Sequence, residues 1–167
     1  MNYIVSVDKN WGIGKENRLL FSLPADMKFF RSMTLGKTVI MGRKTLQSLP
    51  NGAPLKNREN IVLTRDERFK ADGCTICHSL GQLAETLRDK NTDEIFVIGG
   101  AAIYNLLYNY CKFAYITKVD AVSDADTFIE NLDCDANWKA VSEGDPIEEN
   151  GLVFRFVTYE NSQVKIF

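Results

Sequence analysis

One carboxylate near the start of the chain stands among apolar residues. The stretch LFSLPADMKFF, residues 20–30, surrounds Asp26 with side chains that could otherwise fill a core. On a helix Asp26 would share a face with Phe30 and Met33, because residues four and seven apart lie on the same side. A carboxylate in such a setting suits acid–base chemistry or the binding of a polar heterocycle, so Asp26 is a candidate functional residue.

A different interpretation of Asp26 stays open at this point. An acid in the first turn of a helix is stabilised by the helix dipole and can face water, and spacing alone favours that arrangement. At the mouth of an apolar pocket, burial would instead raise the pKa of the carboxyl unless a cationic ligand paired with it. The apolar neighbours of Asp26 count in favour of the pocket.

Residues suited to phosphate binding follow three expected strands. A double glycine lets the backbone approach a ligand closely, and the start of a helix attracts anions. Each strand end alone could be a tight turn or carry a solvated cation, but the three together indicate a nucleotide with several phosphates. The residues at these ends are Gly99-Gly100, Gly42 with Arg43, Lys44 and Thr45, and Thr64 with Arg65.

Strands and helices must position these residues, and the apolar pattern that predicts them is typical of an α/β protein. Expected strands cover residues 1–8, 37–42, 60–64, 75–79, 94–100 and 113–121, and expected helices cover residues 24–34, 43–49, 80–90 and 101–110. Long connections are expected at residues 9–22 and 50–59. Alternating residues at 138–144 and 152–160, around a turn-rich connector at 144–151, predict an antiparallel edge. The sheet is therefore expected to be mainly parallel, with ligands at the carboxyl ends of its strands.

The composition is that of an ordinary globular chain. Its 167 residues suit one domain, and a net charge of −2 gives no sign of a nucleic-acid or anionic-membrane surface. No apolar run is long enough to span a bilayer, and the first residues carry no targeting signal, which favours a cytoplasmic protein. The cysteines are interpreted as buried free thiols with no metal, because Cys74 and Cys77 would face opposite sides of a strand.

The motifs and their order resemble those of the bacterial dihydrofolate reductase family over essentially the full chain. The matching stretches are GIGKENRLLFSLPADMKFF, TVIMGRKT, NIVLT, FVIGGAAIY and AYIT. The resemblance implies that family's eight-stranded, mostly parallel sheet with an antiparallel C-terminal edge and four helices. It also implies a single domain in which residues 37–90 form an adenosine-binding subdomain.

The resemblance further implies an oxidoreductase. NADPH would deliver hydride to C6 of dihydrofolate, with protonation at N5, and the tetrahydrofolate formed would supply one-carbon metabolism and thymidylate synthesis. Asp26 would hold the ring nitrogen and exocyclic amine of the pterin. Leu19 would cover the nicotinamide from a mobile loop, and Phe21 stands at a catalytic position where the family usually has Trp.

The implied substrate pocket combines apolar and polar side chains. Thr117 would bond to the Asp26 carboxylate, and Arg58 would receive the α-carboxylate of the substrate's glutamate. The remaining substrate contacts would be Val5, Ser6, Met27, Phe30, Leu49, Leu55 and Ile98.

The implied cofactor site follows the strand ends already described. Arg43, Thr64 and Arg65 would contact the 2′-phosphate of NADPH, and Lys44 and Thr45 would meet the other phosphates. Gly99-Gly100 resembles the family's cis double glycine. The remaining cofactor contacts would be Ser6, Ile13, Gly14, Gly42, Leu63, Ile98, Ala101, Ala102, Ile103 and Tyr104.

Partners and alternatives complete the expectations. The resemblance implies a monomer that binds dihydrofolate and antifolates such as trimethoprim, with no nucleic-acid or membrane partner. One alternative is the pyrimidine reductase of riboflavin synthesis, which shares the fold and NADPH, and another is a non-catalytic nucleotide-binding module. The folate enzyme is favoured over the pyrimidine reductase by Asp26 after Leu-Pro-Ala and by the GIGKEN stretch. Catalysis is favoured over a non-catalytic module by the presence of both Asp26 and the double glycine.

Overall fold

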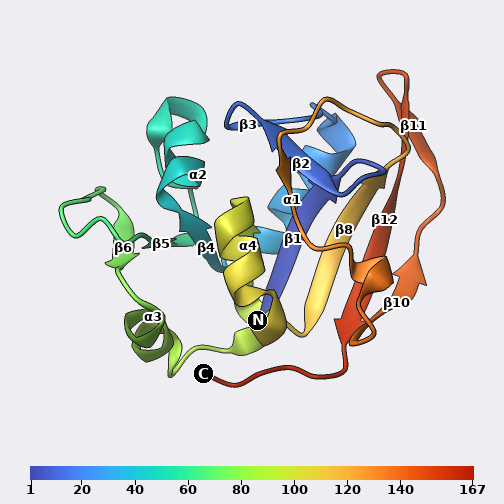
Figure 1. Cartoon of the computed structure of the whole chain (residues 1–167). Helices are drawn as coiled ribbons and strands as arrows, with labels where there is room; N and C mark the ends of the chain where they lie inside the picture. The colour runs from blue at the N-terminus through green and yellow to red at the C-terminus, as the bar shows by residue number, and fades with distance from the viewer.

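A mixed β-sheet forms the centre of the computed structural model, which describes residues 1–167 (Figure 1). Along the sheet the strands run in the order β10-β12-β8-β1-β7-β4-β5-β6. β12 is antiparallel to β8 and to β10, and the other six strands of this path are parallel. The strands are β1 (Asn2–Val7), β4 (Thr38–Gly42), β5 (Glu59–Leu63), β6 (Cys74–Cys77), β7 (Ile95–Gly99), β8 (Phe113–Val119), β10 (Trp138–Glu143) and β12 (Leu152–Asn161).

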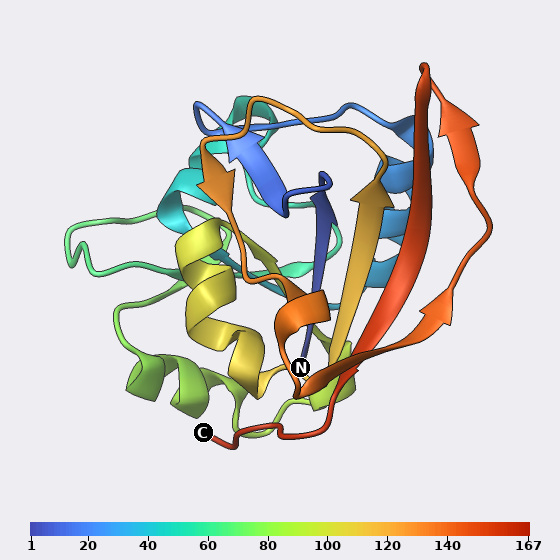
Figure 2. The ribbon, with the colours of Figure 1, turned by 45° about the vertical axis from the view of Figure 1, so that its right-hand side comes forward.

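Helices cover both faces of this sheet, which explains why its central strands are apolar throughout. Leu83 of α3 and Leu107 of α4 pack into the core on one face, whereas Leu46 of α2 and Phe30 of α1 pack on the other. Figures 1 and 2 show α4 and α1 on these opposite faces. The four expected helices are confirmed, the last three with somewhat shorter C-terminal ends: α1 (Pro24–Thr34), α2 (Arg43–Ser48), α3 (Leu80–Leu87) and α4 (Ala101–Leu107).

The expectation that residues 9–22 form only a connection is wrong. They contain β2 (Gly12–Lys15) and β3 (Arg18–Leu19), which join β9 (Thr127–Phe128) in a separate three-stranded sheet. Glu16 and Asn17 have φ angles of 49° and 60°, as a tight two-residue hairpin turn requires. The strand that completes this sheet lies more than a hundred residues further along, where local periodicity cannot reveal it.

The expected connector at 144–151 also needs correction. It contains β11 (Ile147–Glu149), which pairs with β12 in a hairpin. Asn150 and Gly151, with φ angles of 52° and 75°, form its turn, and an Asn-Gly pair is a strong hairpin signal that the sequence did carry. Short 3-10 turns occupy η1 (Pro50–Gly52), η2 (Thr92–Glu94), η3 (Tyr108–Tyr110) and η4 (Leu132–Cys134).

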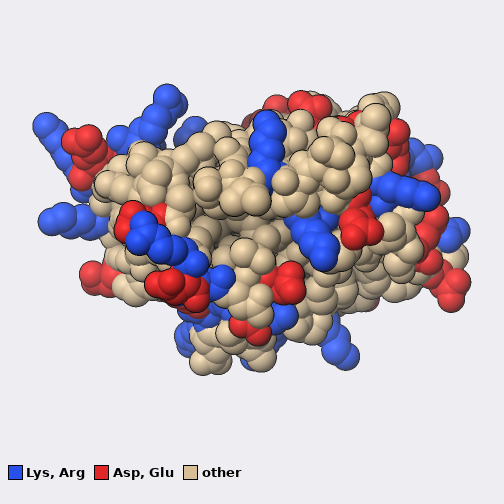
Figure 3. All heavy atoms as spheres, turned by 90° about the horizontal axis from the view of Figure 1, so that it is seen from below, with Lys and Arg blue, Asp and Glu red and all other residues tan.

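The cysteines do not all share one environment. Cys77 and Cys111 are buried and Cys74 is partly buried, but Cys134 is exposed, so the expectation of buried thiols fails there. Cys74 and Cys77 pack on opposite faces of the sheet, as expected, although β6 begins one residue earlier than predicted. No helix is long and apolar enough to cross a membrane. Basic and acidic side chains are interspersed on the face viewed in Figure 3.

Candidate active site

Several of the predicted site residues lie where the six parallel strands end. In Figure 1 the carboxyl ends of β1, β4 and β8 point toward the top of the molecule, where β2 and β3 also lie. α1 starts at the same edge, because its first turn reaches β8 through a side-chain hydrogen bond. Ligands of open α/β sheets bind at such an edge.

Asp26 faces the sheet from the first turn of α1. Thr117, on β8, donates a hydrogen bond of 2.6 Å from Oγ1 to Oδ1 of Asp26, which is the contact expected from the sequence. Ser6 lies directly opposite Thr117 in the pairing of β1 with β8, and its buried hydroxyl has no hydrogen-bond partner. The interpretation of Asp26 as an acid turned to water is therefore excluded.

The surroundings of Asp26 disfavour its negative charge. Burial raises the pKa of the carboxyl, the hydrogen bond from Thr117 lowers it in part, and the negative charge of Glu149 raises it further. No ion pair of the protein includes Asp26. Nearby, the buried hydroxyl of Tyr104 donates 2.8 Å to the carbonyl of Ile4, and burial raises its pKa, with a further contribution from the Asp26 charge. A carboxylate without a cationic partner suits a ligand that brings N–H donors.

An apolar wall extends from Asp26 along α1. Four of the predicted substrate contacts pack against the same apolar cluster on this face, namely Phe30, Leu49, Leu55 and Ile98. Met27 and Leu19 are 54% and 73% exposed. The side chains of Val5 and Phe21 lie elsewhere: Val5 packs with the core on the α4 face, and Phe21 packs against Leu23 and its neighbours.

Arg58 lies at the opposite end of α1 from Asp26. Its Nη1 donates 3.1 Å to Oγ1 of Thr34, the last residue of α1, and its Nε donates 3.0 Å to the carbonyl of Lys56. Burial lowers the pKa of Arg58, and the positive charge of Arg31 lowers it further. With a rise of 1.5 Å per residue, α1 separates this positively charged end from Asp26 by roughly 12 Å.

Two glycines bring the starts of α2 and α4 together. Gly42 and Gly100 precede these helices, and a Cβ atom on Gly42 would lie 3.1 Å from Cγ1 of Ile103. A Cβ atom on Gly100 would lie 3.4 Å from Oγ1 of Thr45, on the neighbouring helix. The Gly99-Gly100 peptide is cis. Because neither glycine carries a side chain, the starts of α2 and α4 can approach each other closely.

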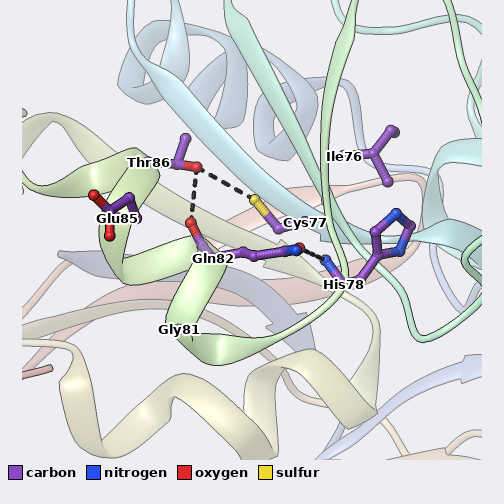
Figure 4. A pocket seen from close by; sticks show the side chains of 7 residues that line it. All are labelled: Ile76, Cys77, His78, Gly81, Gln82, Glu85 and Thr86. Atoms are coloured by element: carbon purple, nitrogen blue, oxygen red, sulfur yellow. Dashed lines mark hydrogen bonds between the residues drawn. The ribbon is translucent and has the colours of Figure 1, made fainter.

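The strand ends next to α2 hold the remaining predicted phosphate contacts. Thr64 and the exposed Arg65 follow β5, and the Nδ1 atom of His78 lies 2.9 Å from the carbonyl oxygen of Thr64. A cavity of about 430 Å³ opens beside them between β6 and α3 (Figure 4), lined by Ile76, Cys77, His78, Gly81, Gln82, Glu85 and Thr86. The sequence did not link His78 to this region, because the link depends on the pairing of β5 with β6.

Two aspartates that the sequence did not single out hold the loop that carries Leu19. Oδ2 of Asp126 accepts a hydrogen bond of 2.9 Å from the backbone of Glu16. Asp8 accepts from the backbone of Gly12 at 2.8 Å and from the hydroxyl of Ser123 at 2.6 Å. Burial opposes ionisation of Asp8, but these hydrogen bonds outweigh it and hold its pKa below the usual value.

The fold and these strand ends define a class of protein: an α/β protein of the nucleotide-dependent enzyme type, with a partly buried carboxylate at the carboxyl edge of its sheet. The comparisons with known proteins make the assignment specific. Residues 1–161 match the family model described as dihydrofolate reductase. The chain belongs to the dihydrofolate reductase family.

Individual relatives match the chain over nearly its whole length. It is 38% identical to the dihydrofolate reductase of Bacillus subtilis over 96% of this chain and 94% of that one. It is 35% identical to the dihydrofolate reductase of Staphylococcus haemolyticus, over 96% and 95% of the two chains. The Enterococcus faecalis dihydrofolate reductase, solved with NADP(H) and RAB-propyl, superposes with a TM-score of 0.84 at 30% identity, covering 96% of this chain and 95% of that one.

Proposed function

We propose that this chain catalyses the NADPH-dependent reduction of dihydrofolate to tetrahydrofolate. The observation that carries the proposal is the partly buried Asp26 carboxylate, which is held by Thr117 and has no cationic partner within the protein. The pterin ring supplies adjacent N–H donors to such a carboxylate, and a charge-assisted pair of hydrogen bonds is strong and directional. Family membership supports the same reaction.

The substrate extends from Asp26 along α1. Phe30, Leu49 and Leu55 contact the aromatic part of the substrate, and Arg58 pairs with a carboxylate of its glutamate. The separation of roughly 12 Å between the two ends of α1 suits a molecule with a donor-bearing ring at one end and an acid at the other. Ser6, whose hydroxyl is buried without a partner, is available to the bound ligands.

Gly42 and Gly100, at the starts of α2 and α4, support binding of NADPH, which would supply the hydride when bound. The backbone of Gly42 and Gly100 and the Thr45 hydroxyl hold its phosphates. Arg43, Thr64 and Arg65 contact the phosphate on the adenosine ribose, and residues 37–90 form the adenosine-binding subdomain. Leu19, on the loop formed by β2 and β3, excludes water from the reacting atoms.

Asp26 acts on the proton rather than on the hydride. Its negative charge favours protonation of the bound pterin at N5, and the proton comes from solvent. The enzyme works as a monomer in the cytoplasm, and antifolates with a diaminopyrimidine ring bind to the same carboxylate.

A spectrophotometric assay tests the proposal. The purified protein should consume NADPH when dihydrofolate is added and not before, and Asp26→Asn should lose this activity. Consumption of NADPH with the pyrimidine of riboflavin synthesis, and none with dihydrofolate, would refute it.

A further inference from the structure

The first turn of α1 has no capping side chain of its own. Leu23, which precedes the helix, offers no side-chain hydrogen bond, and Pro24 at the first helical position has no N–H group. Ala25 therefore carries the first backbone N–H that needs a partner. That partner is Glu149, whose Oε1 atom accepts a hydrogen bond of 3.0 Å from Ala25 although the two residues lie 124 positions apart.

The hairpin of β11 and β12 holds Glu149 in this place. Glu149 pairs with Leu152 across the Asn150-Gly151 turn. Nδ2 of Asn150 donates 3.3 Å to the carbonyl of Ser22, just before α1, and Ile147 packs against the apolar cluster around Leu23. The tip of the hairpin is therefore docked on the segment that enters α1.

The same contact brings a second negative charge close to Asp26. Burial is the largest cause of the raised pKa of Asp26, and the charge of Glu149 adds to it, because two like charges oppose each other's ionisation. On β8, the Thr117 hydroxyl donates to Asp26, and the hydroxyl of Ser6 lies beside it on β1. The Asp26 charge also influences Tyr104, which belongs to α4 on the other face of the sheet. None of these hydroxyls is charged at neutral pH, so Glu149 is the charged residue that acts on Asp26.

We infer that Glu149 is a positioning residue of the active site, whose carboxylate fixes the first turn of α1 and sets the charge environment of Asp26. A carboxylate at a helix start is favourable in itself, because it compensates the positive end of the helix dipole. The expected effect of Glu149 on catalysis rests on the proposed function. Its effects on the first turn of α1 and on the titration of Asp26 do not depend on that function.

Three variants separate the two roles of Glu149. Glu149→Gln keeps an oxygen acceptor for Ala25 but removes the charge, and Glu149→Ala removes both. Glu148→Gln is the matched control, because this exposed neighbour on the same strand forms no side-chain hydrogen bond or ion pair with α1.

Carbon NMR of protein labelled in its aspartate carboxyls reads the titration of Asp26 directly. We expect Glu149→Gln to shift the Asp26 midpoint to lower pH, and Glu148→Gln to leave it unchanged. This measurement needs no turnover, so it stands even if the proposed reaction is wrong. An unchanged midpoint in Glu149→Gln would overturn the electrostatic role.

Steady-state kinetics test whether Glu149 positions the first turn of α1. We expect Glu149→Ala to raise the KM for dihydrofolate, and Glu149→Gln to restore it while its pH profile of kcat/KM moves to lower pH. Wild-type KM in Glu149→Ala would overturn the positioning role. If Glu149→Ala does not fold, an unshifted pH profile in Glu149→Gln decides against the inference.

Discussion

The Thr117 hydroxyl and the Asp26 carboxylate are joined by a hydrogen bond of 2.6 Å between β8 and the first turn of α1. Because Thr117 is buried and fixed in a central strand, the contact orients a carboxylate whose charge the surroundings disfavour. The contact uses one lone pair of Oδ1, so both carboxylate oxygens can still accept hydrogen bonds from a ligand. A disfavoured charge of this kind makes Asp26 a candidate for a binding site.

Replacing Asp26 by Asn should reduce turnover at neutral pH by about a hundredfold or more, the usual effect of losing a group that assists proton transfer. The amide lacks the negative charge that favours protonation of the substrate. Activity should recover in part as the pH falls, because solvent then protonates more of the substrate. The pH profile of kcat measures this, and NADPH affinity serves as the control that should stay near wild type. Wild-type turnover at neutral pH would contradict the assignment.

The same substitution should raise the melting temperature at neutral pH. The folded pKa of Asp26 lies above its unfolded value, so its contribution to stability is full below the unfolded pKa of about 3.9 and is lost as the pH rises through the folded pKa. The amide introduced by Asp26→Asn keeps an oxygen acceptor for Thr117 and carries no charge. Thermal unfolding at several pH values should show that the excess of the variant's melting temperature over that of wild type becomes smaller as the pH falls. If the variant were less stable than wild type at neutral pH, the Asp26 charge would not be destabilising and the prediction would be wrong.

Arg43→Ala should weaken NADPH binding by roughly tenfold or more and leave NADH binding little changed. A hydrogen bond to a charged group contributes about 1.5–3 kcal/mol, and NADH lacks the phosphate that Arg43 is proposed to contact. Fluorescence titration with both cofactors measures the difference. Arg88→Ala is the matched control, because this arginine at the end of α3 pairs with Glu85. Equal losses for NADPH and NADH would reject the role of Arg43 in discrimination.

Asp126→Ala should loosen the loop that carries Leu19 and lower turnover. It removes the acceptor of the Glu16 amide, a contact that joins the turn between β2 and β3 to the residue before β9. Hydrogen exchange at the Glu16 amide should become faster, and kcat should fall. Asp120→Ala, which breaks only an exposed ion pair with Lys9, should change neither. Unchanged exchange at Glu16 would mean that the aspartate does not hold the loop.

The sequence predicted the parallel part of the fold because its signals are local. The buried strand that ends at Gly42 and the helix that starts with Arg43 follow each other directly, and their apolar runs are continuous. The Asp26–Thr117 contact was also expected, although only through the resemblance to a known family. Periodicity alone left Asp26 facing either water or a pocket, and the position of β8 decides between them.

The elements that the sequence did not predict depend on partners that lie far away in the chain. β2 has four residues and becomes a strand only through β3 and β9, and Glu149 matters only because the hairpin tip meets Ala25. Neither of these contacts produces a periodic pattern of apolar residues in the sequence. The Asn150-Gly151 turn was the one local signal of that hairpin.

The place of β12 in the sheet bears on the order in which the protein is made. β12 pairs with β8, with Phe156 opposite Thr117, and its hairpin brings Glu149 to the start of α1. During synthesis, domains generally fold as units. The ends of β4, β5 and β7, which are proposed to bind phosphate, have all been synthesised by residue 100, whereas the surroundings of Asp26 also require the last strand. The carboxylate side of the site can therefore be completed only when translation of the chain is nearly finished.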